Sequence, residues 1–228
     1  MKSISTLLLF ISGIALYAQN TNRSIRFELT YEGNKIDIGE RVFSQNNQDS
    51  ISIETLKFYM SNLLFYYDEK CVDTMTEKHL LIDLGKKNSD DFILLDGINT
   101  EFNDIRFQLG IDSTTNSSGA LGSDLDPTKG MYWTWQSGYI NFKLEGYSKA
   151  CPARNHFFQF HIGGFQHPFQ TLQNLELKVN NANEILINIA IDQLIEKIGL
   201  HETYEIMSPS GKAVEVSSFL PSIFNTLR

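Results

Sequence analysis

Residues 24–31 have the sequence Ser-Ile-Arg-Phe-Glu-Leu-Thr-Tyr, in which apolar and polar side chains alternate. A period of two places Ile25, Phe27 and Leu29 on one face of an extended strand, because successive side chains in a strand point to opposite sides. Residues 32–35, Glu-Gly-Asn-Lys, have the composition of a turn, and a second alternating stretch follows. This pattern predicts a β-hairpin.

The same alternation recurs along most of the chain, and clusters of turn-forming residues separate the apolar runs. Further strands are predicted at residues 52–67, 77–84, 92–95, 102–111, 130–136, 139–145, 156–162, 172–180 and 184–191. Roughly ten short strands joined by turns predict an all-β fold, an antiparallel β-sandwich.

Two short helices are predicted near the C-terminal end. Residues 191–198 carry apolar side chains at helical spacing, and Gly199 follows as a stop. A second helix is predicted after Ser210, and Pro221 limits its length because proline cannot continue a helix. Since no repeat or linker divides the chain, residues 19–228 are predicted to form a single domain.

The composition excludes two classes of partner. Of the 228 residues, 42% are hydrophobic and 12% aromatic, which is typical of a packed globular protein. There are 19 Lys and Arg against 27 Asp and Glu, a formal net charge of −8. Nucleic acids and anionic membranes attract proteins through a positive field, so neither is an expected partner.

The first residues have the pattern of an export signal. Lys2 precedes an apolar run at residues 7–16, and the small Ala18 ends the segment. The run is shorter than the roughly 20 apolar residues that a transmembrane helix needs. Residues 1–18 are therefore predicted to be a cleaved signal peptide rather than a membrane anchor.

Export would place the two cysteines, Cys71 and Cys151, in an oxidising environment, which makes a disulfide between them a candidate. Two isolated cysteines do not indicate contact, so a pair of free thiols is the alternative.

The common enzyme motifs are absent from the sequence. There is no His-Glu-x-x-His, Gly-x-Ser-x-Gly, phosphate-binding glycine loop or Cys-x-x-Cys, which favours a protein that is not an enzyme. The histidines form no closely spaced zinc pair. His156 and His161 are five residues apart, so an unbroken strand would place them on opposite faces.

Two aromatic-rich segments carry the chemistry that remains. Trp133 and Trp135 are the tryptophans of the chain, and as i and i+2 in a strand their indoles are expected to share a face and pack together. Two glycines follow His161 in the sequence His-Ile-Gly-Gly-Phe at residues 161–165, where they permit a bend or a close backbone approach. The alternative to a functional role is structural: the two tryptophans would pack in the core, and the histidine would be a hydrogen-bonded core residue.

The segment at residues 112–130 is long for a loop in a compact domain. It contains four side chains with oxygen ligands of the type that calcium takes: Asp112, Asn116, Asp124 and Asp126. The same side chains also cap turns through hydrogen bonds to the backbone. The capping interpretation is favoured over a calcium site, because the spacing matches no calcium-binding loop.

Five segments together carry a resemblance to a known family. They are Lys-Phe-Tyr-Met-Ser-Asn at 57–62, Gly-Ile-Asp-Ser at 110–113, Leu-Asp-Pro at 125–127 with Gly-Met at 130–131, Trp-Thr-Trp-Gln-Ser-Gly-Tyr at 133–139, and His-Ile-Gly-Gly-Phe at 161–165. The chain resembles the MbnP-like family of exported, methanobactin-associated copper-binding proteins over nearly all of residues 19–228. The resemblance implies a β-sandwich of the bacterial envelope, located in the periplasm or on the outer cell surface.

The resemblance also implies a copper site. In some members of the family a partner di-haem peroxidase of the MauG type oxidises a tryptophan to kynurenine, and histidines bind copper together with the modified residue. At the matching positions the site would include His161, Trp133 and Trp135, and imidazole nitrogen suits copper. His156 or His167 would supply a second histidine if the end of the strand bends.

The rival hypothesis is a metal-free binding or structural module of the cell envelope. Aromatic-rich sandwiches bind glycans by stacking a ring on the face of a sugar. The candidate aromatic residues are Tyr66, Tyr67, Tyr132 and Tyr139. Burial of the aromatic residues and the position of His161 distinguish the two hypotheses.

Overall fold

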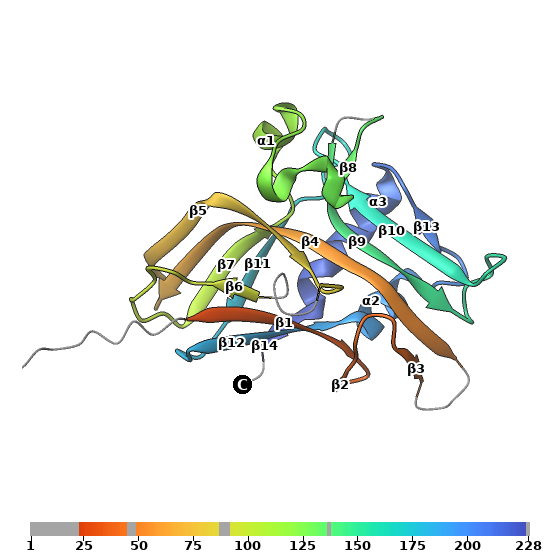
Figure 1. Ribbon diagram of the computed structural model, residues 1–228, viewed down its shortest axis with the longest axis horizontal. Coiled ribbons are helices and arrows are strands. Elements are labelled where there is room, and N and C mark those ends of the chain that lie inside the picture. The colour runs from red at the N-terminus through yellow and green to blue at the C-terminus, as the bar shows by residue number, and fades with distance from the viewer. Residues whose placement is uncertain (1–22, 45–48, 87–91, 136–137, 227–228) are drawn as a thin grey trace, which may run out of the picture.

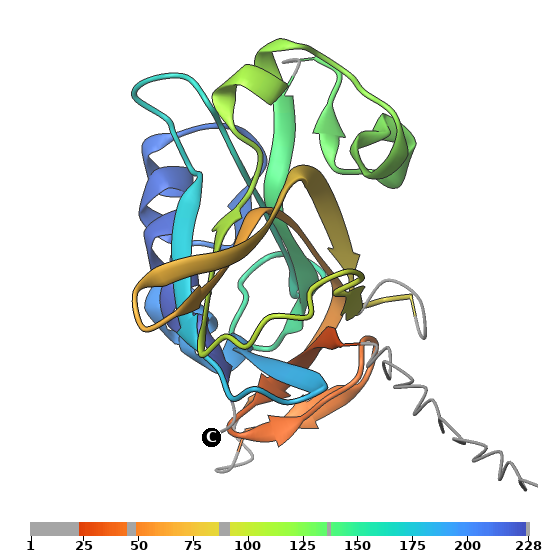
Figure 2. The ribbon, with the colours of Figure 1, turned by 90° about the vertical axis from the view of Figure 1, so that its left-hand side faces the viewer.

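The computed structural model describes residues 23–44, 49–86, 92–135 and 138–226, which fold as a β-sandwich with helices along one side (Figures 1 and 2). The expected all-β fold is confirmed. The strands are β1 (Ser24–Tyr31), β2 (Asn34–Lys35), β3 (Arg41–Phe43), β4 (Ser50–Tyr67), β5 (Lys70–Asp83), β6 (Phe92–Leu94), β7 (Asp104–Leu109), β8 (Tyr132–Trp133), β9 (Gly138–Ser148), β10 (Phe157–Gly163), β11 (Gln173–Lys178), β12 (Glu184–Ala190), β13 (Glu205–Ile206) and β14 (Phe224–Thr226). The helices are α1 (Ser113–Ser117), α2 (Ile191–Ile198) and α3 (Gly211–Phe219), with 3₁₀ turns η1 (Ser123–Leu125), η2 (Pro127–Lys129) and η3 (Leu220–Ile223).

Within the described residues the strands form two sheets. The smaller sheet has the order β14-β12-β1-β2, and β6 also pairs with β1. The larger sheet has the order β11-β7-β4-β9-β10-β13, with β3 and β5 paired to β4 and β8 paired to β9. β1 pairs with β12 in parallel along one edge, and on its other edge β6 and β2 pair antiparallel with its first three and last two residues. A second parallel pair joins β10 and β13, so the sandwich contains both parallel and antiparallel pairs.

The main hydrophobic core lies between the two sheets. Phe58 of β4 is at its centre, with ring centroids 6.4 Å from Phe142 of the large sheet and 5.4 Å from Phe224 of the small sheet. The alternation of apolar residues along the strands therefore has the expected physical origin, because each sheet buries one face in this core.

Both predicted helices are present. Residues 191–198 form α2, and Gly199 ends it with a φ of 68°, the left-handed conformation that favours glycine. Ser210 caps α3 by accepting a hydrogen bond from the backbone N–H of Ala213, and Pro221 lies in the 3₁₀ turn that follows. The two helices, blue in Figure 2, close one side of the sandwich.

A second, smaller hydrophobic cluster lies on the outer face of the large sheet. It includes Tyr59, which follows Phe58 of the main core and therefore points to the opposite side of β4. Residues 111–135, here called the cap segment, fold over this cluster through α1, η1, η2 and β8 (green in Figure 2). The long loop noted in the sequence is thus an ordered lid on a local core.

Two predicted strands have different bounds in the structure. The strand expected at 130–136 is wrong in extent, because β8 ends at Trp133, which pairs with Gly138 of β9; Gln136 lies outside the described residues. The strand expected at 77–84 begins earlier, at Lys70. The first part of β5 is rich in polar residues and lacks the apolar signal of a strand, although it pairs with β4.

The predicted signal peptide at 1–18 lies outside the described residues and stays a prediction. Among the helices of the described part of the chain, none has the length and apolar character needed to cross a membrane.

Candidate functional site

Trp133 and Trp135 are in contact, but they do not share a strand. Trp133 ends β8 and is 6% exposed, whereas Trp135 lies in the following turn and is 66% exposed. Their ring centroids are 6.1 Å apart. The expected packing of the two indoles is confirmed, while the expected common strand is wrong because the chain turns directly after Trp133. The indole Nε1 of Trp133 is buried and has no hydrogen-bond partner among the described residues.

The indole of Trp133 lies against Gly163 of β10. A Cβ atom added to Gly163 would be 2.8 Å from Cζ3 of Trp133 and 2.6 Å from the carbonyl oxygen of Tyr139. Any side chain at this position would displace the indole. The close backbone approach expected after His161 is therefore found, and its partner is Trp133.

His161 is the neighbour of this contact on the same face of β10. Phe160 and Ile162 point into the main core, so His161 and Gly163 point to the outer face. Two residues of extended strand separate them, about 7 Å. His161 is 7% exposed, and the Trp133 indole covers Gly163, two residues further along the same face.

Glu145 of β9 is the hydrogen-bond partner of the His161 ring. Nε2 of His161 is 2.7 Å from Oε1 of Glu145. The hydrogen bond from His161 lowers the pKa of Glu145 to about 2; hydrogen bonding from Thr55 and the charge of Lys143 act in the same direction, against the effect of burial. The carboxylate is therefore ionised at neutral pH and can only accept. In a neutral His161 the proton is on Nε2, and Nδ1 keeps its lone pair.

This arrangement is typical of a metal-binding histidine. Such a ligand usually donates its second ring N–H to a carboxylate, which fixes the tautomer and the orientation of the ring. The imidazole of His161 thus offers a nitrogen that fits a copper ion, whereas the indole Nε1 of Trp133 carries a proton and has no lone pair to donate.

β13, which pairs with β10, is followed by a thioether. Gln159 of β10 pairs in parallel with Glu205 of β13, and their side chains are hydrogen-bonded at 2.5 Å on the outer face. The ladder ends at Phe160 and Ile206, and Met207, which is exposed, is the residue directly after it. The sequence analysis missed both Glu145 and Met207, because no local pattern indicates which strands flank β10.

The other candidate histidines are less well placed. His156 precedes β10 and is exposed, with a φ of 58° and its Nδ1 2.9 Å from the carbonyl oxygen of Cys151. It lies at the opposite end of β10 from Gly163, so the structure does not bring it together with Trp133. His167 lies in the loop after β10 and lines a pocket together with Trp133.

The candidate calcium ligands in the cap segment are occupied by local hydrogen bonds. Asp112 caps α1 and accepts from the backbone N–H and the hydroxyl of Thr115, at 2.9 and 2.7 Å. Although burial raises the pKa of Asp112, these hydrogen bonds leave it below its usual value. Asn116 is buried and accepts from the backbone N–H of Tyr139 while donating to the carbonyl oxygen of Ile111, both at 2.9 Å.

The two remaining aspartates behave in the same way. Asp124 accepts from the backbone N–H of Leu81 and pairs with Lys129 at 2.6 Å. Asp126 caps η2 by accepting from the backbone N–H of Thr128. The four side chains thus have hydrogen-bond or ion-pair partners of the kind that the capping interpretation predicts.

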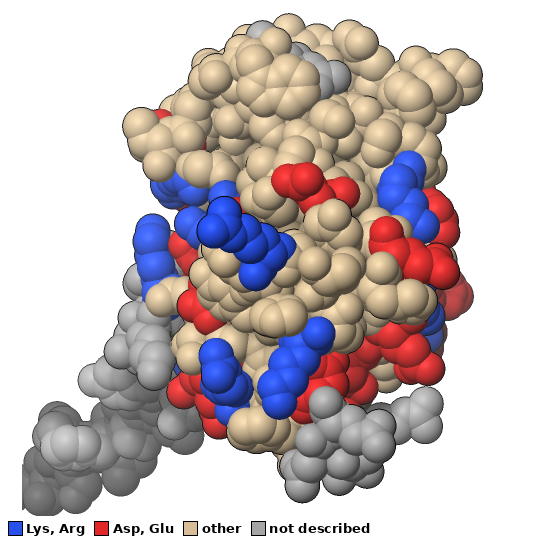
Figure 3. All heavy atoms as spheres, turned by 90° about the vertical axis from the view of Figure 1, so that its right-hand side faces the viewer, with Lys and Arg blue, Asp and Glu red and all other residues tan. Residues whose placement is uncertain are grey.

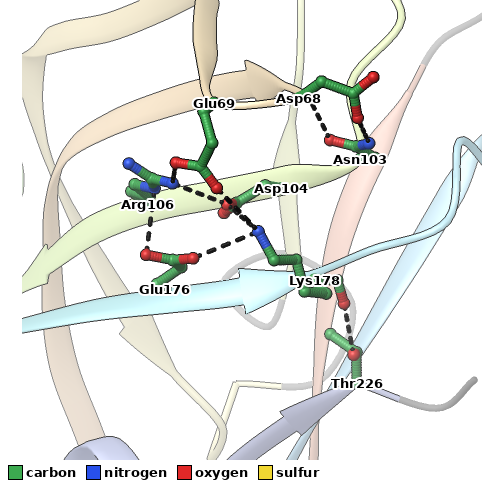
Figure 4. Close-up of polar contacts among 8 residues, drawn as sticks. All are labelled: Asp68, Glu69, Asn103, Asp104, Arg106, Glu176, Lys178 and Thr226. Atoms are coloured by element: carbon green, nitrogen blue, oxygen red, sulfur yellow. Dashed lines mark hydrogen bonds and ion pairs between the residues drawn. The ribbon is translucent and has the colours of Figure 1, made fainter.

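One group of carboxylates does converge among the described residues, at the edge of the large sheet (Figure 4). Oxygen atoms of Glu69, Asp104 and Glu176 lie within 4.8 Å of one another. Nζ of Lys178 is 2.7 Å from Asp104 and 3.3 Å from Glu176, and Arg106 is 2.6 Å from Glu69. The two cations occupy the space between the carboxylates, so this group is a charge-compensated network rather than a metal site.

The candidate disulfide is not formed. Cys71 and Cys151 are both free, the first exposed and the second buried. Cys71 pairs with Tyr66 near one end of β4, and Cys151 follows Ser148, which pairs with Ile51 near the other end. Roughly 40–50 Å of strand separates these ends, whereas a disulfide requires Cβ atoms about 4 Å apart.

The tyrosines proposed as a glycan platform do not form one. Tyr139 is buried and Tyr132 is half-buried. The ring of Tyr66 is covered by the guanidinium of Arg106, 4.0 Å from its centroid, and Tyr67 is exposed beside it at the end of β4.

Comparisons with known proteins agree with this fold. The MbnP family model matches residues 19–208. The solved structure of MbnP from Methylosinus trichosporium has a TM-score of 0.57 and 12% sequence identity, covering 76% of this chain and 77% of that chain, a likeness that shows the fold. The search of curated proteins gave no match. Because the family match spans far more than half of the residues, the chain belongs to the MbnP family.

Proposed function

We propose that this protein is an exported, non-enzymatic copper-binding protein, and that His161 binds the metal through Nδ1 on the outer face of the large sheet. The observation that carries the proposal is the hydrogen bond from Nε2 of His161 to the ionised Glu145. This hydrogen bond holds the ring in place and leaves the lone pair of Nδ1 available to a metal ion. Membership of the MbnP family supports the same chemistry, since the resemblance to that family implies copper binding.

Met207 completes the donor set of this proposal. Thioether sulfur is a soft ligand that favours Cu(I), and imidazole suits both oxidation states of copper. The parallel pairing of β10 and β13, which ends one residue before both His161 and Met207, supports a position for Met207 near His161. We expect His161 to be the anchor of the site and Met207 to favour the reduced ion.

Trp133 and Trp135 are the proposed substrates of a di-haem peroxidase of the MauG type. With hydrogen peroxide as oxidant, the enzyme would add two oxygen atoms across the C2–C3 bond of one indole and release two waters; hydrolysis would then remove one carbon as formate. The kynurenine that remains carries an aniline nitrogen that can also donate to copper. The exposure of Trp135 supports access to its ring from the surface, and its contact with the buried Trp133 brings the two rings together. Intact mass identifies the change as a net gain of one oxygen and loss of one carbon.

Copper titration of the purified mature protein tests the proposal. His161→Ala is expected to weaken binding of Cu(I) and Cu(II) by well over about tenfold, because it removes the anchoring ligand. Met207→Leu is expected to weaken binding of Cu(I) more than that of Cu(II), because the thioether is soft. His201→Ala is the matched control, since His201 is highly exposed in the turn after α2. Equal copper affinities of the wild type and His161→Ala would contradict the assignment.

A further inference from the structure

A pocket opens at the end of the molecule that carries the cap segment, between Trp133 and the loop that follows β10. Its volume is about 270 Å³. Trp133, Phe165 and Phe169 contribute aromatic rings, and Gln166 and His167 contribute polar groups. The proposed copper ligands His161 and Met207 are not among the residues that line this pocket.

Among the described residues, the lining of the pocket includes no lysine, arginine, aspartate or glutamate. Figure 3 shows charged side chains over the middle and lower parts of one face of the molecule and few on its upper part, where the cap segment lies. An ionic ligand would lose its hydration without gaining an ion pair in this pocket. The chemistry of the lining therefore selects a neutral ligand.

A buried polar network holds the loop that forms one wall. The carbonyl oxygen of Gly164 accepts from the backbone N–H and the hydroxyl of Thr171, at 3.1 and 3.3 Å. Asn141 of β9 donates to the Thr171 hydroxyl at 2.9 Å and accepts from the backbone N–H of Ile111 at 3.0 Å. The side chains of Asn141 and Thr171 are both buried.

This network fixes the ends of the loop to the large sheet and to the cap segment. At the same point a Cβ atom on Gly164 would lie 2.1 Å from the carbonyl oxygen of Phe169, so the loop closes tightly. Residues 166–170 are nevertheless exposed. An exposed loop with buried, fully hydrogen-bonded supports is a preorganised wall, which is typical of a ligand pocket.

The size and polarity of the pocket fit one ring with hydroxyl groups. Its volume is just below the roughly 300 Å³ at which pockets for drug-sized ligands begin. Aromatic faces pack against the C–H groups of a pyranose. The amide of Gln166 and the imidazole of His167 each offer both a donor and an acceptor, which matches the hydroxyl groups of a sugar. We propose that this pocket binds the terminal neutral pyranose of a glycan.

Binding of the mature protein to an array of neutral and acidic glycans, followed by calorimetry on the best ligand, tests the proposal. Phe169→Ala is expected to weaken binding at least about tenfold, because it removes one aromatic wall. Thr171→Val keeps every ring but breaks the support of the loop, and it is expected to weaken binding as well. Tyr67→Ala is the matched control, because Tyr67 is an exposed aromatic residue at the end of β4, outside the pocket. Circular dichroism and the melting temperature of each variant establish that it is folded.

The outcomes separate this proposal from the copper site. Binding of neutral-ended glycans that falls in Phe169→Ala and stays unchanged in Tyr67→Ala supports the pocket. Absence of binding to every glycan, preference for acidic ends, or equal loss in Tyr67→Ala overturns it. In His167→Ala, weaker glycan binding with unchanged copper affinity supports the assignment. Weaker copper binding with unchanged glycan binding in that variant would show that the pocket belongs to the metal site, and it would overturn the proposal.

Discussion

Glu145 is the residue on which the chemistry of His161 depends. Its carboxylate lies between the His161 ring and the ammonium of Lys143, whose Nζ is 3.4 Å from the same Oε1 atom. These partners are made only in the folded protein. They stabilise the charged form of Glu145 and couple the stability of the fold to pH.

We expect Glu145→Gln to lower the free energy of unfolding at neutral pH by about 2 kcal/mol, the contribution of a hydrogen bond to a charged group. The pKa of Glu145 is about 2 in the folded state, below its ordinary value of 4.5. A lowered pKa means that the carboxylate stabilises the fold fully above pH 4.5 and loses this contribution as the pH falls towards 2. Urea unfolding of the wild type and Glu145→Gln across this range measures the effect. A difference that stays constant down to pH 2 would contradict it.

His161 and Trp133 were found from the sequence because each lies in a distinctive local motif. Glu145 lies in an ordinary alternating strand, and its role arises only from the register of β9 against β10. His156 illustrates the opposite case. Its closeness to His161 in sequence suggested a shared site, but an extended strand carries residues apart along its length.

The cap segment is held by side chains rather than by regular secondary structure, and Asn116 is the clearest case. It is 3% exposed, and its side-chain amide joins α1 to both Ile111 and Tyr139, near the start of β9. Asn116→Ala would leave the backbone N–H of Tyr139 buried without its side-chain acceptor. We expect a loss of about 2–3 kcal/mol in the free energy of unfolding.

Chemical unfolding of Asn116→Ala measures this loss, and Asn99→Ala is the control because Asn99 is exposed in a turn.

Addition of excess calcium or of a chelator is expected to leave the melting temperature of the wild type unchanged, since the four candidate calcium ligands, Asp112, Asn116, Asp124 and Asp126, already have hydrogen-bond or ion-pair partners. A melting temperature that rises with calcium would show that a cation replaces these hydrogen bonds.

The predictability of each element follows from the range of the contacts that form it. β1, β7 and β12 were predicted closely because alternation is a local signal of a half-buried strand. The stop at Gly199 and the cap at Ser210 defined α2 and α3 for the same reason. β13 and the parallel pairing of β1 with β12 were not predicted, because they depend on partners that are distant in sequence.

At the scale of the whole molecule, the first and last strands of the described residues belong to the same small sheet. β1 lies between β12 and β2 in the small sheet, and β12 also pairs with β14. The core residue Phe58 of the large sheet packs against Phe27 of β1 and Phe224 of β14. Because first and last strands share one core, we expect the described residues to unfold cooperatively.

The two free cysteines report this cooperativity. Cys71 is exposed, whereas Cys151 is fully buried, with its thiol donating to the carbonyl oxygen of Phe157 at 3.2 Å. A thiol reagent is therefore expected to label one cysteine rapidly in the native protein and both in denaturant, with or without prior reduction. In Cys71→Ser the remaining thiol should react at least about a thousandfold more slowly than in denaturant, because labelling requires an opening that costs most of the folding free energy. Mass spectrometry of the labelled protein counts the reacted thiols. If neither cysteine reacts in denaturant until a reductant is added, the two form a disulfide. That result would contradict the structure, which places them at opposite ends of β4.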